Sequence, residues 1–205
     1  MSFRLKVASA MATRSLLERE LGRVAEMTTA ELDGMVEEHA PGALDALRSE
    51  DRPMEGDLEA KRRAMADAQR RRVAALVDAM GEDAAVEEGR RRMGPVGERL
   101  GSEARKRLGV DTSMEDLVAA ARFLYKVLGI DFTVEEHRDT SVTLHIQRCG
   151  LSEGYDGVTC RLMSATDEGM VRGLNPAARL EFRHRLTEGA SECVADIELR
   201  REAGT

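Results

Sequence analysis

The spacing of hydrophobic residues changes near Gly129, and this change limits the folds open to the chain. Before Gly129 the apolar residues recur every three or four positions, as in helices, and after it they alternate, as in strands. A run of helices followed by a run of strands favours segregated layers over alternating strand–helix units. We therefore predict an α+β fold, with an N-terminal helical layer packed on a C-terminal four-stranded antiparallel sheet that has one inserted helix.

Glycines, prolines and capping residues mark the expected ends and starts of helices in the N-terminal part. Gly22 is expected to end the first helix, and Thr28-Thr29-Ala30-Glu31 has the pattern of a capping box that starts the second. Gly94-Pro95 is expected to separate two shorter helices, and Gly129 to end the last one. The predicted helices span residues 2–21, 28–41, 54–80, 82–93, 96–108 and 113–129.

The C-terminal part reads as two hairpins around one helix. The alternating runs 132–137 and 141–149 flank a short turn, and the runs 180–187 and 191–200 flank a second turn. Between the hairpins, residues 158–171 are expected to form the inserted helix, which carries Cys160. Two hairpins of this kind account for the four predicted strands.

Composition excludes several classes of function. The 205 residues carry a formal net charge of −7 and only 3% aromatic residues, so we expect no general affinity for nucleic acid. The arginine triplets at 70–72 and 90–92 lie among acidic residues and predict an ion-paired helix surface. No apolar run is long enough for a membrane span, and no export signal is seen. With an odd number of cysteines, these features indicate a cytoplasmic protein in a reducing environment.

All three cysteines lie in the C-terminal part, each in a different predicted element. Cys149 ends a strand, Cys160 lies in the first turn of the inserted helix, and Cys193 lies on the last strand. If these elements converge, three thiols can hold a metal with one position left open, or support a nucleophile. Cys160 is the expected nucleophile because a helix N-terminus favours a thiolate. The alternative is three unrelated buried cysteines, since free cysteine behaves as a small hydrophobic residue.

One histidine and one carboxylate join the cysteines as candidates. Strand alternation places His184 on the same face as Leu180 and Phe182, which should point inward, so it is a candidate ligand or base. The other interpretation is a histidine that is simply hydrogen-bonded in the interior. Asp156, at the start of the inserted helix, is the candidate for acid–base catalysis, with Asp167 and Glu168 as further carboxylates near this helix.

Several short motifs resemble those of a known family. They are the segment 76–84, the segment 128–132, Arg148-Cys149-Gly150, Thr159-Cys160-Arg161, Gly173-Leu174-Asn175-Pro176 and Gly189-Ala190-Ser191-Glu192-Cys193. On these motifs the region 76–200 resembles the L-2-amino-thiazoline-4-carboxylic acid hydrolase-like family, which is related in layout to vinyl-reductase-type hydrocarbon-binding domains. One departure is Gly150, where many members of the family carry proline after the first cysteine.

The resemblance implies a helical layer over an antiparallel sheet, with Cys149, Cys160 and Cys193 near a small-molecule pocket. The implied function is hydrolysis of a small cyclic amidine or thiazoline. A zinc ion or a [4Fe–4S] cluster would be held by the three cysteines, with His184 as a further ligand. The alternative is a non-catalytic module that binds a small molecule or senses redox state through structural or switch cysteines. Residues 1–72 would form a dimerisation surface or a lid, residues 73–205 would form the hydrolase-like domain, and a homodimer is one expected assembly.

Overall fold

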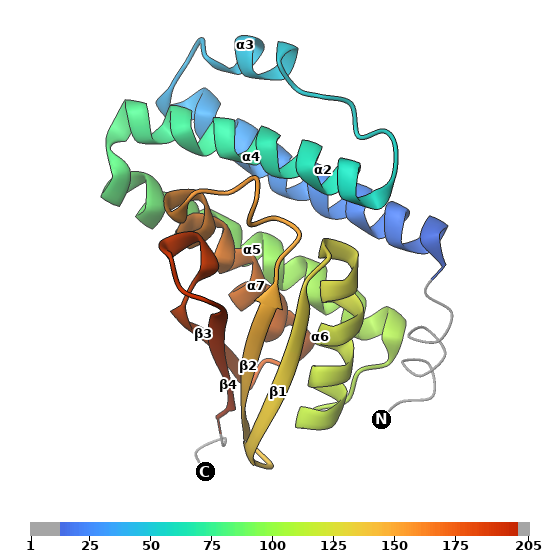
Figure 1. The fold of residues 1–205 in the computed structure, drawn as a ribbon. Coiled ribbons are helices and arrows are strands. Elements are labelled where there is room, and N and C mark those ends of the chain that lie inside the picture. Colours follow the sequence, from blue (N-terminus) through green and yellow to red (C-terminus); the bar gives the residue numbers. More distant parts are fainter. Residues whose placement is uncertain (1–12, 201–205) are drawn as a thin grey trace.

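The computed structural model describes residues 13–200, and its elements follow the predicted order of helices first and strands later (Figure 1). The α+β prediction is therefore confirmed. The helical part consists of α2 (Arg14–His39), α3 (Leu44–Ser49), α4 (Leu58–Met80), α5 (Glu82–Leu108) and α6 (Met114–Leu128). The sheet part consists of β1 (Asp131–Arg138), β2 (Ser141–Arg148), α7 (Gly157–Leu174), β3 (Ala178–His184), the short 3₁₀ helix η1 (Leu186–Glu188) and β4 (Cys193–Leu199).

Two of the predicted helix ends are wrong. Helix α2 runs straight through Gly22 and the expected capping box, because Leu21 and Ala25 are buried on either side of the glycine. Burial of such side chains outweighs the cost of about 1 kcal/mol for a glycine in a helix. Helix α5 likewise continues through Gly94-Pro95. Residues 2–12 of the first predicted helix lie outside the described residues.

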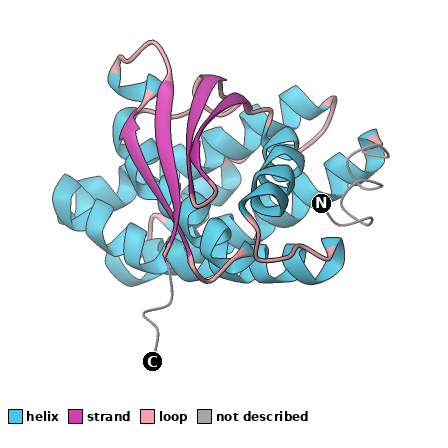
Figure 2. Cartoon of the chain, turned by 90° about the horizontal axis from the view of Figure 1, so that it is seen from below, coloured by secondary structure: helices cyan, strands magenta, loops and turns pink. Residues whose placement is uncertain are grey.

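The sheet is antiparallel with strand order β1-β2-β4-β3, so the two hairpins pair through β2 and β4. Val142, Leu144 and Ile146 of β2 are buried, as the alternation predicts. Ile146 lies opposite Cys193 across the β2–β4 pair. Figure 2 shows the strands gathered on one side of the helices, so the sheet has a covered face and a more open one.

Helices α5 and α7 approach each other unusually closely, because glycines line their contact. A Cβ atom added at Gly97 would lie 2.0 Å from the carbonyl oxygen of Thr166, and one at Gly169 would lie 2.0 Å from that of Gly94. Only residues without a side chain permit this backbone-to-backbone approach. The glycines therefore fix the position of α7, which crosses from the first hairpin to the second.

Helices α2 and α4 form a second pair above this one (Figure 1). Arg72 of α4 is 1% exposed, and its guanidinium contacts Asp33 of α2 at 2.5 Å and Asp51 at 2.7 Å. Asp51 lies in the segment that joins α3 to α4, so one arginine ties both helices to this connection. The arginine triplets are ion-paired as predicted, although Arg72 is buried and not on the surface.

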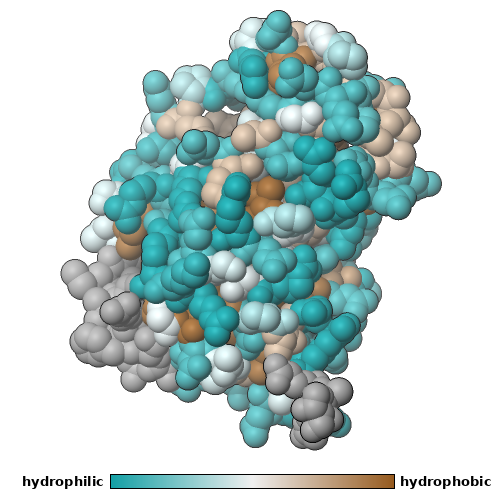
Figure 3. Space-filling view, turned by 180° about the vertical axis from the view of Figure 1, so that it is seen from behind, coloured by the Kyte–Doolittle hydropathy of each residue, from teal (hydrophilic) through white to brown (hydrophobic). Residues whose placement is uncertain are grey.

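The surface seen from behind is mostly hydrophilic, with hydrophobic residues scattered over it (Figure 3). None of the helices within residues 13–200 combines the length and the hydrophobicity that a bilayer crossing requires. The homodimer and the division of the chain at residue 73 both stay predictions.

Candidate functional site

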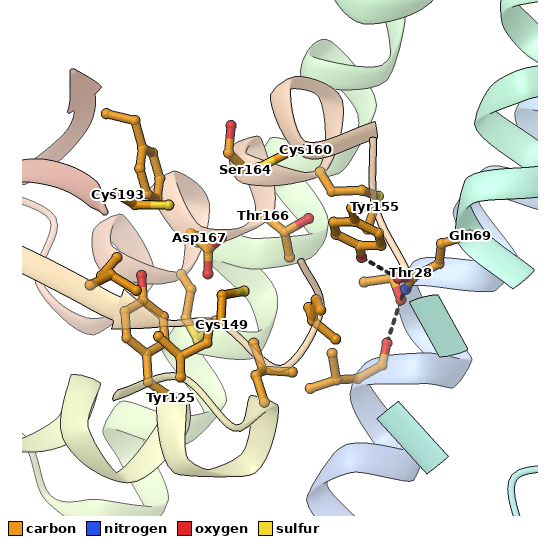
Figure 4. Close-up of a pocket in the computed structure, with 18 of the residues that line it drawn as sticks. Thr28, Gln69, Tyr125, Cys149, Tyr155, Cys160, Ser164, Thr166, Asp167 and Cys193 are labelled. Atoms are coloured by element: carbon orange, nitrogen blue, oxygen red, sulfur yellow. Dashed lines mark hydrogen bonds between the residues drawn. The ribbon is translucent and has the colours of Figure 1, made fainter. Parts of the chain in front are cut away.

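A pocket lies where α7, the sheet and the N-terminal helices meet, and all three cysteines line it (Figure 4). Its cavity volume is about 80 Å³. That space holds several waters or a small organic ligand. Most of the lining is apolar. The polar exceptions are the cysteines and Thr28, Gln69, Tyr125, Tyr155, Ser164, Thr166 and Asp167.

Helix α7 supplies the reactive wall of the pocket. Cys160, Ser164 and Asp167 are separated by four and three residues, so they form one stripe along the helix and all line the pocket. Because the glycine contact with α5 fixes the position of α7, it also fixes this stripe relative to the sheet. Cys149 follows β2 and Cys193 begins β4, which brings two more thiols to the same cavity.

Asp156 has a structural role at the start of α7. It is the N-cap residue, and its side chain accepts a hydrogen bond of 2.7 Å from the backbone N–H of Thr159. The side chain is exposed and does not line the pocket. A carboxylate before a helix satisfies otherwise free backbone N–H groups, which explains its presence here. The carboxyl that lines the cavity belongs to Asp167, and a catalytic role for Asp156 stays a prediction.

Asp167 is surrounded by protein, although its side chain keeps some accessible surface where it faces the cavity. Its pKa is raised from 3.8 to about 7, mainly by burial and to a smaller extent by the neighbouring Glu168 charge. The Tyr125 hydroxyl, which hydrogen-bonds to the carboxyl, and the Arg185 guanidinium act in the opposite direction. Near neutral pH this carboxyl is thus poised between its acid and base forms.

The three thiols are not activated in this arrangement. Burial raises the pKa of Cys149 to about 12 and also raises the pKa of Cys160 and of Cys193. The hydroxyl of Thr187 and the charge of Arg185 lower the pKa of Cys160, but burial is the larger effect. The expected thiolate at the helix N-terminus is therefore disfavoured, because desolvation opposes the charged form.

The cysteines share a cavity without forming a metal site. Within residues 13–200, no three side chains among histidine, cysteine, aspartate and glutamate lie close enough together to hold a metal ion. The Sγ atom of Cys193 instead accepts a hydrogen bond of 3.2 Å from the backbone N–H of Leu186. In this arrangement the donor set does not fit a zinc ion or a cluster.

The inward orientation predicted for His184 is wrong. Phe182 lies opposite Ala195, whereas His184 lies opposite Val194, so the register shifts between the two residues of β3. An irregularity of this kind, a β-bulge, breaks the alternation of side chains along the strand. His184 is exposed and does not line the pocket. It is therefore not placed to act as a ligand or base beside the cysteines.

A buried hydrogen-bond chain forms the opposite wall of the pocket (Figure 4). Tyr155 contacts Gln69 of α4, and the Nε2 atom of Gln69 lies 2.7 Å from the Oγ1 atom of Thr28 on α2. Thr28 in turn donates to the carbonyl of Val24, also at 2.7 Å. The pocket therefore includes residues from helices that precede the sheet by many positions in the sequence.

Arg185 lies directly behind two residues of the pocket wall. Its Nη2 atom is 3.3 Å from the Oγ atom of Ser164, and its guanidinium lies 5.1 Å from the ring centre of Phe182. Its Nη1 atom is 3.8 Å from Glu188, and its buried Nε atom has no hydrogen-bond partner among the described residues. A partly satisfied cation of this kind supplies positive potential to the cysteine end of the cavity.

The sequence interpretation missed Tyr125, Arg185 and the chain through Gln69. For Asp167 a signal was present, because it follows Cys160 by seven residues and so shares its helical face. Arg185 follows the bulge in β3, where alternation no longer predicts direction. The residues of the polar chain come from separate helices, and no local pattern links them.

One comparison with known proteins shows the family, and another supports the fold. The sequence model of the family described as L-2-amino-thiazoline-4-carboxylic acid hydrolase matches residues 61–196. Among curated proteins, none matches the sequence closely enough to count as a relative.

Several solved structures resemble this one, and two of them serve as examples. A trafficking protein particle complex subunit 3 from Naegleria fowleri, covalently bound to palmitic acid, has a TM-score of 0.53 at 13% identity, over 70% of this chain and 98% of its own. An H-NOX protein from S. oneidensis in the Fe(II)NO ligation state has a TM-score of 0.45 at 14% identity, over 85% of this chain and 98% of its own. The first likeness supports the fold. We infer nothing from the second, because its TM-score is below 0.5.

Proposed function

The chain belongs to the L-2-amino-thiazoline-4-carboxylic acid hydrolase family, and from this premise we propose that it hydrolyses a small heterocycle that contains nitrogen and sulfur. The bond broken would be a ring C–N or C–S bond of a cyclic amidine or thiazoline. The pocket lined by the three cysteines would be the active site.

One observation carries this proposal: a carboxyl group with a pKa of about 7 lines a largely apolar pocket. General bases work best when their pKa lies near the working pH, and burial is a common way to raise a carboxyl group to that value. The nearby Tyr125 hydroxyl favours the charged form of this carboxyl group and so partly offsets the effect of burial. Asp167 is therefore proposed as the general base, and afterwards as the general acid.

The reaction is an addition of water followed by ring opening. The Asp167 carboxylate takes a proton from water while the water oxygen bonds to the amidine-like ring carbon, and the electron pair of the C=N bond moves onto nitrogen. The ring C–S or C–N bond then breaks, and the proton held by Asp167 passes to the departing sulfur or nitrogen. The net change is the addition of one water, with Asp167 returned to its starting form.

The roles of the cysteines stay predictions. No step of this scheme passes through a metal, since the donor set does not fit one in this arrangement. Cys160 remains a candidate nucleophile, and Cys160→Ser tests it. Elemental analysis of protein purified without oxygen tests for zinc or an iron–sulfur cluster.

The decisive experiment compares two carboxyl-to-amide variants on one helix. Asp167→Asn should lower kcat/KM for 2-amino-thiazoline-4-carboxylate by about 100- to 10,000-fold, the usual contribution of general acid–base catalysis. Asp156→Asn keeps the helix cap, since asparagine and aspartate cap equally well, and should retain turnover. In the wild type, kcat/KM should rise about tenfold per pH unit below pH 7 and level off above it, because the base must be deprotonated. Full activity of Asp167→Asn would refute the assignment.

A second candidate function is non-catalytic binding of an apolar ligand. The specific observation in its favour is the lining of the pocket, which is mostly apolar with one carboxyl group. The Naegleria fowleri protein with a similar fold is covalently bound to palmitic acid. A module of this kind would use the same cavity to hold a hydrocarbon chain or ring, with the cysteines as part of its wall.

Binding and turnover separate the two candidates. Calorimetry with palmitic acid and with the thiazoline, combined with a mass-spectrometric search for a product heavier by one water, distinguishes them. Saturable binding of palmitic acid without any thiazoline turnover would favour the binding module. Turnover that depends on Asp167 would favour the hydrolase.

A further inference from the structure

The hydrogen-bond chain on the α2–α4 side of the pocket has only one consistent direction. It ends at the backbone carbonyl of Val24, an atom that can only accept, so the hydroxyl of Thr28 must donate its single proton there. The Oγ1 atom of Thr28 then has only lone pairs for Gln69, and it accepts from the Nε2 amide. This orients the Oε1 atom of Gln69 toward Tyr155, whose hydroxyl must donate.

This direction determines what the chain presents to a ligand. Gln69 and Thr28 are each 1% exposed, so Tyr155, which is partly exposed, is the member that a ligand reaches most easily. Its only hydroxyl proton is committed to Gln69. Burial raises the pKa of Tyr155 well above its usual value, so the phenol stays protonated at neutral pH. Toward the cavity, the Oη atom of Tyr155 can therefore act only as an acceptor.

We propose that Tyr155 is a specificity residue that accepts a hydrogen bond from an N–H group of the ligand. The inference rests on the proposed function and deepens it, because the amino group of a 2-amino-thiazoline is a donor of this kind. A ligand of the same shape that carries a methyl group in place of the amino group leaves Oη without a partner. Sites built around one hydrogen bond reject such analogues more strongly than apolar sites reject a missing methyl group.

The hydrogen-bond chain also explains why α2 contributes to a site whose other polar groups come from α4, α6, α7, β4 and the loop between β2 and α7. Thr28 does not reach the ligand as a donor, and it acts by holding the amide of Gln69 in one orientation. Without the hydrogen bond from Gln69 to Thr28, the amide of Gln69 can rotate and turn its N–H group toward Tyr155. The tyrosine proton would then be free to point into the cavity, and the preference for a donor ligand would weaken.

The test is a pair of compounds measured on four forms of the full-length protein. The compounds are 2-amino-thiazoline-4-carboxylate and its 2-methyl counterpart, and Kd is measured by calorimetry. The preference is expressed as the Kd of the methyl compound divided by the Kd of the amino compound. This ratio should be above one in the wild type. Tyr155→Phe should reduce it about tenfold, which corresponds to one hydrogen bond. Comparing ratios between proteins cancels the difference in ring basicity between the compounds.

Two substitutions at Thr28 complete the set and guard against a misfolded Tyr155→Phe protein. Thr28→Val removes the hydroxyl at constant shape and should reduce the ratio by a smaller factor. Thr28→Ser keeps the hydroxyl and should preserve the ratio. If the hydrogen-bond chain has only a structural role, the variants should have a lower melting temperature and an unchanged ratio of Kd values. Circular dichroism measures the melting temperature, and calorimetry measures the ratio.

The outcomes separate this inference from the proposed function. If Tyr155→Phe and Thr28→Val retain the wild-type ratio, the inference is overturned and the hydrolase proposal stands. If the wild type binds neither compound, the inference and the proposed substrate class are overturned together. A reduced ratio in Tyr155→Phe and a preserved ratio in Thr28→Ser support the inference.

Discussion

The two helix pairs that position the walls of the pocket are held together by different kinds of contact. Helices α5 and α7 contact through glycines, with added Cβ atoms at only 2.0 Å from the facing carbonyl oxygens of Thr166 and Gly94. Helices α2 and α4 are joined by the buried ion pairs of Arg72 and by the hydrogen bond between Gln69 and Thr28. Apolar residues also join α2 to α4, and the Arg90–Glu168 ion pair also joins α5 to α7. The pairs nevertheless differ in their most specific contacts, which are backbone against backbone in one pair and polar side chains in the other.

The difference corresponds to what each pair contributes to the site. The α5–α7 contact positions the stripe that contains Cys160 and Asp167, where a shift of a fraction of an ångström would misplace reacting groups. The α2–α4 pair positions the polar chain that ends at Tyr155. Tight backbone packing suits the first task because it leaves no alternative arrangement. Directed hydrogen bonds suit the second because they fix the positions of protons.

The largest effect is expected from filling the glycine contact. Gly97→Ala would place a methyl group in space occupied by the backbone of Thr166, so α5 and α7 would have to separate. We expect a loss of about 5 kcal/mol or more in the free energy of unfolding, measured by urea titration. Gly22→Ala is the matched control, because nothing lies within 4 Å of an added Cβ there. It should stabilise the protein by about 0.5–1 kcal/mol.

A smaller loss is expected from breaking the ion pairs of the upper helix pair. Arg72→Met keeps the length of the side chain but leaves Asp33 and Asp51 without their buried partner. Asp33 also contacts Arg48, and Asp51 also contacts Arg71, so neither carboxylate is left without a cation. We therefore expect the free energy of unfolding to fall by about 3 kcal/mol, the lower end of the range for breaking a buried ion pair. Arg91→Met, on an exposed arginine paired with Glu88, should cost less than about 1 kcal/mol. Equal losses would show that burial does not distinguish the two pairs.

Substitution of Asp167 is expected to increase the stability of the protein, in contrast to the two changes above. Its pKa is about 7 in the folded protein and near 3.8 when unfolded, so the folded state binds more protons between these values. Stability contributed by this group is therefore highest below pH 4 and is lost as the pH rises through 7. Asp167→Asn should raise the free energy of unfolding by about 2 kcal/mol at pH 8 and by little at pH 4. Denaturant titrations at the two pH values check this.

The smallest effect is expected at the cap of α7. Asp156→Ala removes the acceptor for the Thr159 N–H and should cost about 1 kcal/mol, whereas Asp156→Asn should be nearly neutral. A large loss of turnover in Asp156→Asn, with stability retained, would restore the catalytic role expected from the sequence. Thermal unfolding and activity measured on the same samples distinguish these cases.

The fold was largely predictable from the sequence, and the site only in part. The change of periodicity at Gly129 correctly predicted the helical layer and the two hairpins. His184 was misplaced because a bulge shifts the strand register, and alternation cannot reveal an extra residue. The sequence named Asp156, Asp167 and Glu168 as carboxylates near this helix but could not rank them, because burial decides which carboxyl group has a raised pKa. The chain from Tyr155 to Thr28 depends on the packing of separate helices.

The Arg148-Cys149-Gly150 motif shows the same dependence on packing. The backbone N–H of Gly150 donates to the carbonyl of Gly129 at 3.0 Å, and an added Cβ would lie 2.6 Å from the carbonyl oxygen of Leu128. Proline has no N–H group to donate and brings a ring to this position. Glycine at position 150 is therefore suited to the close approach of this turn to the end of α6.

The contribution of α2 to the pocket has a consequence for how ligand range can change. Val24 and Thr28 line the cavity, yet they precede residue 61, where the family match begins. The reactive wall on α7 and this section of the opposite wall on α2 are thus encoded by separate parts of the sequence. Substitutions at Val24 or Thr28 would change the surface presented to the ligand without altering Asp167 or the cysteines. The range of ligands can therefore change through residues that lie apart, in the sequence, from those of the reactive wall.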